Sequence, residues 1–386
     1  MSKLKVAALQ GLSASSDAIT LANDGTCTAN ITNNLSNRNL IINGAMLVAQ
    51  RGTSSTISGY GTVDRMNQHS GGTDEAPTFS QVDISSGTTP YTNGFRKAIK
   101  ITNGNQTSGA GTSDYVYVQT ILEGQDIANS GWNYTSDSSY ITISYWIKSS
   151  VAQNFYGLIT SSDGTAQAYV WETGSLSADT WTKITKTIPG NSNLTFDNDN
   201  GAGMYFSPVR AFDGTARTGS MSLNSWAAYS GSARTPDQTS TWYTTNDATL
   251  EVTGLQLEVS DHATDFEHRS YGDELARCQR YCYVDKGSDD YHAVAQGHYN
   301  GSTTAIFMIF TPVAMRAAPT VSTPTGTWIC SGDAGGLSTS NITGADNIGE
   351  TNAFQIRATV SGAESGEGFL FRTSSAGHSF ILDSEL

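Results

Sequence analysis

Cysteine is scarce in this sequence. Only four cysteines occur in 386 residues, and Cys27 and Cys330 lie far along the chain from Cys278 and Cys282. So small and scattered a set excludes the dense disulfide framework of small secreted domains. A zinc site needs four nitrogen or sulfur ligands at compact spacing, and Cys278 and Cys282 have no second pair to complete one. We therefore expect thiols that are buried and pack as small apolar side chains.

Long apolar runs are also absent. A helix that spans a bilayer needs about 20 apolar residues, whereas the longest apolar run here is Ala305–Phe310, which fits one buried strand. Residues 1–10 contain two lysines but no apolar core, so they do not form a secretory signal. We expect no membrane span and a chain that is synthesised in the cytoplasm.

The common catalytic motifs are missing. The sequence contains no Gly-x-Ser-x-Gly, no P-loop and no His-Glu-x-x-His. Its six histidines stand singly, and for His262 and His268 we expect structural hydrogen bonds. Glycoside hydrolysis needs only two carboxylates at a suitable separation, and 35 acidic residues leave that alternative open. Because no carboxylate pair stands out, we expect a protein that is not an enzyme.

Positive charge is in the minority. The chain has 35 acidic and 21 basic residues, which gives a formal net charge of -14 at pH 7. A surface of this sign repels phosphate backbones and anionic lipids. We therefore expect neither nucleic acids nor membranes as partners.

Glycine and aromatic residues, by contrast, are abundant. The sequence has 39 glycines, 17 tyrosines and 7 tryptophans, and only 15% of its residues are charged. Aromatic residues separated by small turn-forming residues favour many short antiparallel strands. Residues such as Ile141, Ile143, Tyr145 and Ile147 alternate with polar ones, as in a strand with one buried face. The composition and the alternation together predict an all-β fold.

The chain divides into four predicted parts. Residues 1–38 are polar and irregular, and we read them as an arm that attaches to a larger particle, with a disordered leader as the alternative. Residues 39–269 are predicted to form a β-sandwich, residues 270–283 a linking helix, and residues 284–386 a smaller C-terminal β-sandwich. Within the last part, the Gly- and Ser-rich residues 326–350 are expected to be a long connection.

The junction at residues 250–283 combines a shift of strand register with a helical stripe. Leu250 and Val252 fall on even positions, and Leu255, Leu257 and Val259 fall on odd ones, so one residue must be absorbed between them. A bulge at Gly254 does this with a backbone that glycine tolerates.

The stripe follows after a short polar link. Tyr271, Leu275, Cys278 and Cys282 are spaced as one apolar face of a helix of about three turns, with Ser270 or Asp273 as its N-cap. This face packs either against its own chain or against a second copy.

Several blocks of this sequence resemble bacteriophage tail-fibre and related virion surface proteins. Three of them lie at the junction, namely Thr253–Val259, Phe266–Arg269 and Glu274–Tyr281. The others are Asn39–Gly52, Tyr60–Arg65, Ile141–Lys148 and Trp181–Thr185, so the resemblance spans roughly residues 39–320. Met66 and Cys282 depart from it, because the family usually has aromatic residues at both positions.

The resemblance implies a fold and a role. It favours a jelly roll like those of carbohydrate-binding modules for the sandwich, and a virion surface protein that is a tail-fibre or receptor-binding subunit. It also implies a homo-oligomer, in particular a trimer, that docks on a tail or capsid protein and recognises a host surface glycan from the virion exterior. A capsid decoration or head-fibre protein without a receptor role is one alternative, and a polysaccharide depolymerase is another.

Candidate ligand-binding residues follow from this reading. Tryptophan rings stack on sugar rings, and four tryptophans lie in or beside loop-like segments, namely Trp132, Trp171, Trp226 and Trp242. The alternative for each is packing in the core. The long Ser-, Thr- and aromatic-rich loop at residues 217–247 is expected to be functional or mobile. Asp197 and Asp199 offer the oxygen ligands that calcium prefers, although the segment is not an EF-hand and a plain turn is the alternative.

Overall fold

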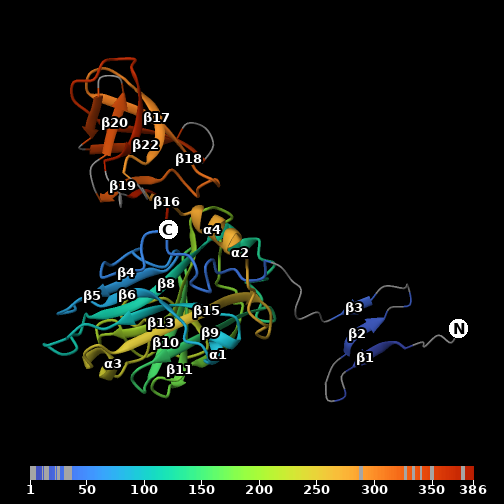
Figure 1. Cartoon of the computed structure of the whole chain (residues 1–386). Helices are drawn as coiled ribbons and strands as arrows, with labels where there is room; N and C mark the ends of the chain where they lie inside the picture. Colours follow the sequence, from blue (N-terminus) through green and yellow to red (C-terminus); the bar gives the residue numbers. More distant parts are fainter. Residues whose placement is uncertain are drawn as a thin grey trace.

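The computed structural model describes most of the chain and has an almost purely β architecture (Figure 1). The described residues are 6–10, 12, 17–21, 23, 27–29, 37–286, 290–325, 328–332, 335–339, 341–347, 352–374 and 379–386. Their four helices are all short, namely α1 (Thr89–Thr92), α2 (Gly124–Ala128), α3 (Thr241–Thr244) and α4 (Tyr271–Gln279). None of these helices is long and apolar enough to cross a membrane. The expected all-β class is confirmed.

Part of the predicted arm forms a small antiparallel sheet. Its strands are β1 (Ala8–Gln10), β2 (Asp17–Leu21) and β3 (Cys27–Ala29), paired in that order. Leu9 and Leu21, which belong to this sheet, are exposed. The sheet thus leaves apolar side chains in solvent, as expected of a segment too polar to build a core of its own.

The predicted sandwich consists of two six-stranded antiparallel sheets. The first has the order β14-β11-β10-β13-β8-β5, with bounds β14 (Trp226–Ala228), β11 (Gln167–Ser175), β10 (Asn154–Ser161), β13 (Ala202–Asp213), β8 (Tyr115–Glu123) and β5 (Asn67–Gly71). The second has the order β12-β9-β15-β7-β6-β4, with bounds β12 (Thr182–Pro189), β9 (Tyr140–Ser149), β15 (Thr249–Val259), β7 (Lys97–Thr102), β6 (Thr78–Asp83) and β4 (Ser54–Ser55). Neighbouring strands are mostly distant in sequence, as in a jelly roll.

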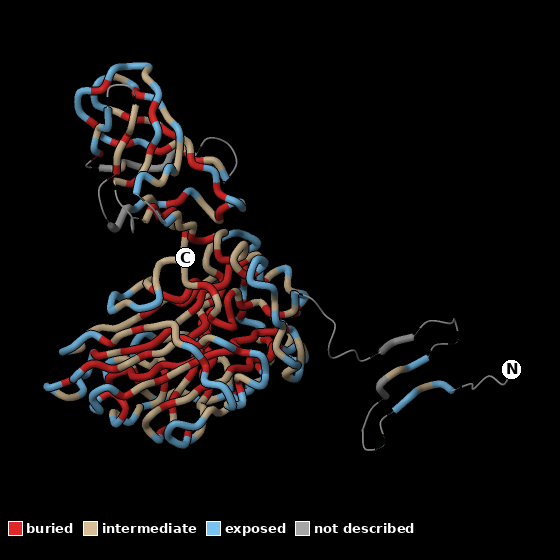
Figure 2. The backbone as a smooth tube through the Cα atoms, in the orientation of Figure 1, coloured by how far each residue is buried: buried red, intermediate tan, exposed pale blue. Residues whose placement is uncertain are grey.

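The core of the sandwich lies between these two sheets. Figure 2 shows the buried backbone running through the middle of this unit. Ile141, Ile143, Tyr145 and Ile147 of β9 point inward, which is the face that their alternation predicts. The inner face of the first sheet meets them with residues such as Phe206. Each sheet therefore buries one face and leaves the other free for packing against loops or for contact with ligands.

The register of β15 shifts at Gly254. Its pairing with β9 is irregular between Thr253 and Gln256, and Gly254 has a φ of 64°. A Cβ atom at this glycine would lie 2.6 Å from Cζ of Phe95. The bulge keeps Leu250 and Leu257 both in the core although they lie an odd number of residues apart.

The linking helix is shorter than the sequence pattern predicts. Helix α4 ends at Gln279, and Cys282 begins strand β16 (Cys282–Lys286) instead of continuing the helix. Ser270 is the N-cap, and its hydroxyl accepts a hydrogen bond from the Asp273 amide at 3.2 Å. Cys278 and Cys282 are buried free thiols in this chain.

The predicted stripe is therefore only partly buried. Leu275 is half-buried, while Tyr271, at the start of the helix, is 57% exposed. The apolar face of α4 thus packs against its own chain toward its C-terminal end only.

The C-terminal part forms a second β unit with its own core. A three-stranded sheet has the order β16-β25-β19, and a seven-stranded sheet has the order β21-β20-β24-β17-β18-β23-β22. Their bounds are β17 (Ala293–Tyr299), β18 (Thr304–Phe310), β19 (Thr320–Thr325), β20 (Trp328–Gly332), β21 (Gly335–Thr339), β22 (Asn341–Asn347), β23 (Ala353–Thr359), β24 (Gly368–Thr373) and β25 (Ser379–Asp383). The expectation of a long connection at residues 326–350 is therefore wrong. Strands β20, β21 and β22 lie there, because backbone pairing with β24 and β23 does not require apolar side chains.

Charged side chains join this unit to the sandwich. Glu385, which follows β25, forms ion pairs with Arg51 and Arg65 of the sandwich. Gln50 donates to the carbonyl of Cys282 at 2.7 Å. In Figure 1 the C-terminus lies beside β16, near α4. The end of the chain thus packs against the same junction at which the C-terminal unit begins.

Candidate functional site

The outer face of the first sheet is hollowed over β5, β8, β10 and β13. Side chains of β8 alternate across this sheet: Val116 and Val118 enter the core, while Tyr115, Tyr117 and Gln119 lie on the opposite face. On this outer face Gln119 is half-buried, whereas the Tyr117 ring is only 7% exposed. The alternation in the sequence predicts this two-faced strand, although not which face is the outer one.

One irregularity in β13 brings two charged residues to the same face. Residues 210 and 213 are an odd number apart, so a regular strand would place them on opposite sides. The register of β13 with β8 shifts between Arg210 and Phe212, and Ala211 and Phe212 both enter the core. Arg210 and Asp213 consequently lie together, as their ion pair shows.

Side chains of this face and of two loops line an open cavity of about 400 Å³. We call it the tyrosine cleft. It is lined by His69, Tyr117, Gln119, Leu158, Thr160, Ser161, Ser162, Ala166, Tyr205, Arg210, Tyr229 and Arg234. A volume of this size, with apolar rings and a few convergent polar groups, is typical of small-molecule sites.

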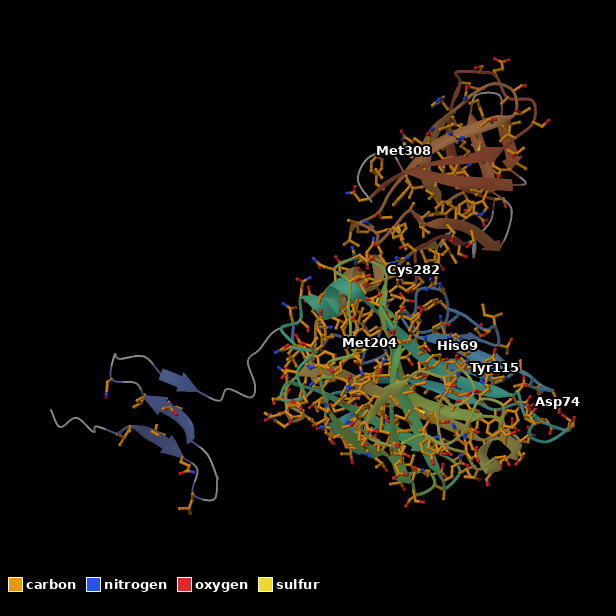
Figure 3. All side chains as sticks on the ribbon, turned by 180° about the vertical axis from the view of Figure 1, so that it is seen from behind. His69, Asp74, Tyr115, Met204, Cys282 and Met308 are labelled. Carbon is orange, nitrogen blue, oxygen red and sulfur yellow. The ribbon has the colours of Figure 1, made fainter. Side chains whose placement is uncertain are left out.

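Three side chains of the cleft form a row across three adjacent strands. His69 on β5 and Arg210 on β13 are both register partners of Tyr117 on β8. The rings of His69 and Tyr117 stack with centroids 4.5 Å apart, and the Arg210 guanidinium carbon lies 3.7 Å from the centre of the Tyr117 ring. Figure 3 shows His69 and Tyr115 close to each other in the sandwich, apart from Cys282 at the junction. Stacking of this kind fixes the orientation of all three side chains.

Asp213 ties two arginines to the cleft wall. Its carboxylate accepts hydrogen bonds from Nε and Nη2 of Arg210, and its Oδ1 also accepts one from Nε of Arg217 at 3.0 Å. Arg217 in turn lies over the ring of Tyr115, 3.9 Å from its centroid. Tyr115 lies across Gly71, where a Cβ atom would come within 2.7 Å of the ring. Burial alone would lower the pKa of Arg210, but the charge of Asp213 outweighs it and raises this pKa above the usual value.

His69 is a neutral side chain at pH 7. Burial, followed by the positive charges of Arg210, Arg217 and Arg234, lowers the pKa of His69 from 6.5 to about 4. Its Nε2 atom is buried and has no hydrogen-bond partner among the described residues. A buried polar atom without a partner is unfavourable, so a hydrogen bond from a ligand to this nitrogen would be a net gain.

The long loop at residues 217–247 closes one side of the cleft. Part of it, β14 (Trp226–Ala228), pairs with the edge strand β11 and so fixes the loop to the first sheet. The amide of Arg234 donates to the carbonyl of Arg217 at 2.8 Å, which holds the second half of the loop near the cleft. The loop contributes Tyr229 and Arg234 to the lining.

Three of the four candidate tryptophans are core residues. Trp132 is 3% exposed, and Trp171 and Trp242 are fully buried. The indole nitrogen of Trp171 donates to the Tyr145 hydroxyl at 3.1 Å. A ring without an exposed face has no surface to stack on a ligand. Trp226 is half-buried and packs edge-on against Tyr169 outside the cleft lining, so its role in binding stays a prediction.

Asp197 and Asp199 lie beside Asp163, and turn hydrogen bonds use oxygens of this cluster. Asp163 Oδ2 accepts from the amide of Asp197, and Asp199 Oδ1 accepts from the amide of Gly201, both at 2.9 Å. Burial, and then the charges of the other two aspartates, raise the pKa of Asp163. Within the described part of the chain, no three His, Cys, Asp or Glu side chains are arranged to hold a metal ion. Calcium at this turn stays a prediction.

A larger hollow of about 660 Å³ lies where the arm joins the sandwich. Its lining includes Arg38, Asp126 and Arg277 but no aromatic side chain among the described residues. This hollow lacks the flat apolar surface that the tyrosine cleft has. The tyrosine cleft is therefore the better candidate for a ligand.

Sequence reasoning did not single out the residues of this cleft. The alternation of residues 115–119 was a usable signal for Tyr117, because its apolar neighbours face the core. His69, Arg210 and Arg234 carried no comparable signal, since they come from three segments that only the sheet and its loop bring together.

No family model matches the sequence, and none of the curated proteins does. Among solved structures, the chain is similar to the enzymatically active domain of tailspike protein 4 of bacteriophage CBA120, at 8% identity and a TM-score of 0.30. This match covers 58% of the present chain and only 22% of the tailspike chain. The family 11 carbohydrate-binding module of a Clostridium thermocellum cellulosomal cellulase matches at 16% identity and a TM-score of 0.26, over 56% of this chain and 98% of the module.

The N-terminal cellulose-binding domain of a Cellulomonas fimi β-1,4-glucanase is a third similar structure. It matches at 12% identity and a TM-score of 0.27, over 55% of this chain and 98% of the domain. All three TM-scores lie below 0.5. The fold and the site therefore rest on the strand pairing and side-chain contacts of this chain.

Proposed function

We propose that this protein binds a glycan in the tyrosine cleft. The observation that carries this proposal is the combination, on one outer sheet face, of aromatic rings with hydroxyl and amide side chains. The half-buried rings of Tyr205 and Tyr229 offer apolar faces to the C–H groups of a sugar ring. Gln119 and Thr160 supply hydrogen-bonding groups at the same surface for its hydroxyls.

The wider role we propose is that of a virion surface protein, namely a tail-fibre or receptor-binding subunit. The resemblance of residues 39–320 to that family supports it, as does the separate small sheet β1–β3, which suits an attachment arm. A single shallow site binds weakly, so several copies held together would gain avidity, in agreement with the trimer that the resemblance implies. A decoration protein of the capsid has the same domains and is the main alternative.

We further propose that the protein binds the glycan without cleaving it. Hydrolysis of a glycosidic bond requires two carboxylates that flank the bond. None of the described residues that line the cleft is an aspartate or a glutamate. Incubation of the purified protein with host polysaccharide should therefore release no new reducing ends. Sustained release of fragments would favour the depolymerase alternative.

The test of the binding role uses the purified full chain and host cells. The protein should bind the cells and block infection, and Tyr205→Ala should weaken both effects. Tyr271→Ala is the matched control, because this exposed tyrosine on α4 lies outside the cleft lining. If the unaltered chain neither binds cells nor blocks infection, the decoration alternative is favoured. Equal binding by the Tyr205→Ala variant would remove the cleft as the site.

A further inference from the structure

Positive charge is concentrated at the tyrosine cleft. Arg210, Arg217 and Arg234 surround it, and Asp213 is the carboxylate paired with the first two. Three guanidiniums against one carboxylate leave an excess of positive charge. The whole chain carries a net charge of -14, so the sign at the cleft is opposite to that of the protein as a whole. The positive charge at the cleft therefore results from the arrangement of these arginines and does not follow from the composition of the chain.

Arg234 is the arginine of the cleft whose positive charge is not neutralised by an ion pair within the described part of the chain. It lines the cavity, and it forms no ion pair with any residue that the structure describes. Its Nε atom is buried and has no hydrogen-bond partner in the same part of the chain. The backbone of Arg234 is nevertheless held by its bond to Arg217. A positioned guanidinium with a donor that lacks a partner matches an anionic oxygen group.

His69 adds a second polar group without a partner at the same cavity. Its ring is fixed by stacking on Tyr117, and its Nε2 atom has no partner among the described residues. A neutral imidazole nitrogen exchanges a hydrogen bond with a hydroxyl or a carbonyl oxygen without bringing a further charge. The cleft therefore presents one charged and one neutral polar group to the same ligand.

We propose that the tyrosine cleft selects an acidic glycan, whose anionic group pairs with Arg234 while a neighbouring oxygen bonds to Nε2 of His69. This inference rests on the proposed glycan binding and names the class of sugar. The overall negative charge does not oppose it, because at physiological salt the field of distant charges is screened beyond about 8 Å. At contact distance the attraction between the Arg234 guanidinium and the anionic group exceeds the repulsion by distant acidic residues.

The test compares two matched pairs of polysaccharides on the full chain. Polygalacturonate and its methyl ester share a backbone and differ in the carboxylate, while dextran sulfate and dextran differ in the sulfate. We expect the chain to bind the charged member of at least one pair about tenfold more tightly than the neutral member, the order of one charge-assisted hydrogen bond. The pair that shows the difference identifies the anionic group.

Two arginine variants distinguish the effect of an arginine in the cleft from the effect of the net charge of the protein on binding. Arg234→Gln should abolish the preference for the charged member. Arg96→Gln removes the same charge from an exposed arginine beside Tyr91, outside the cleft lining, and should preserve it. Equal binding of charged and neutral members would overturn the selection of acidic sugars and leave glycan binding intact. Failure of the unaltered chain to bind any of the four polysaccharides would count against both proposals.

Discussion

Arg280 and Glu123 form a two-point ion pair that joins the linking helix to the sandwich. Nε and Nη2 of Arg280, the residue after α4, donate to the two carboxylate oxygens of Glu123 at 2.8 and 2.7 Å. The Glu123 side chain is fully buried at the end of β8, and Tyr281 also donates to it. Burial would raise the pKa of Glu123, but the bonds from Arg280 and Tyr281 outweigh burial and lower it. The helix is therefore fixed to the sandwich by charge as well as by packing.

Glu123→Gln should destabilise the protein through this contact. The amide has no charge and only one acceptor oxygen, so at least one donor of Arg280 or Tyr281 would lose its partner. We expect the free energy of unfolding to fall by about 2 to 3 kcal/mol in urea denaturation. The control is Glu251→Gln, whose pair with Lys148 is partly exposed and should be worth less than about 1 kcal/mol. Equal effects of the two substitutions would contradict this account of the junction.

Acid should weaken the protein through His69. The pKa of this side chain is lowered from 6.5 to about 4 in the folded state, so between these values the unfolded chain binds more protons. Stability must then fall as the pH is lowered from about 6.5 to about 4, by roughly 2 to 3 kcal/mol at 1.36 kcal/mol per pKa unit. His69→Gln should remove this component from the pH profile of unfolding. A His69→Gln variant that still loses the same stability between these two pH values would contradict this assignment.

A side chain at Gly254 should be strongly unfavourable. Gly254→Ala places a Cβ atom on a left-handed backbone and within 2.6 Å of Phe95. Strain and overpacking together should lower the free energy of unfolding by about 2 to 4 kcal/mol. Gly272→Ala provides the comparison, because this glycine lies in α4 with open space around it and alanine is the better helix former. Thermal unfolding that is unchanged in Gly254→Ala would show that the bulge is not required.

Trp171 should matter for stability and not for ligand binding. Trp171→Ala removes a fully buried ring and its hydrogen bond to Tyr145, which should cost about 3 to 5 kcal/mol. The folded fraction of this variant should retain the glycan affinity of the unaltered chain in a binding titration. Loss of affinity without loss of stability would return this tryptophan to the list of ligand contacts.

Much of the fold follows from local patterns. The alternation at Ile141–Ile147 predicts a strand with one buried face, and the change from even to odd positions around Gly254 predicts a bulge, because both depend on the period of 2 along a strand. The end of the helix was less predictable. Cys282 continues the apolar spacing of α4, yet strand β25 pairs with the backbone of residues 282–286 and the chain leaves the helix at Gln279.

The site depended on tertiary structure. A sequence shows that tryptophans and tyrosines are present, but burial of a ring depends on which sheet face meets the opposite sheet, and so Trp171 is in the core while Tyr205 lines the cleft. Arg210 and Asp213 share a face only because β13 is irregular against β8. Arg234 lines the same cleft only because its loop is bound to the first sheet and to Arg217. The sequence by itself determined the strands with a clear alternation, such as Ile141–Ile147, and the net charge. Long-range pairing decided which polar groups meet, because it joins segments that no local pattern connects.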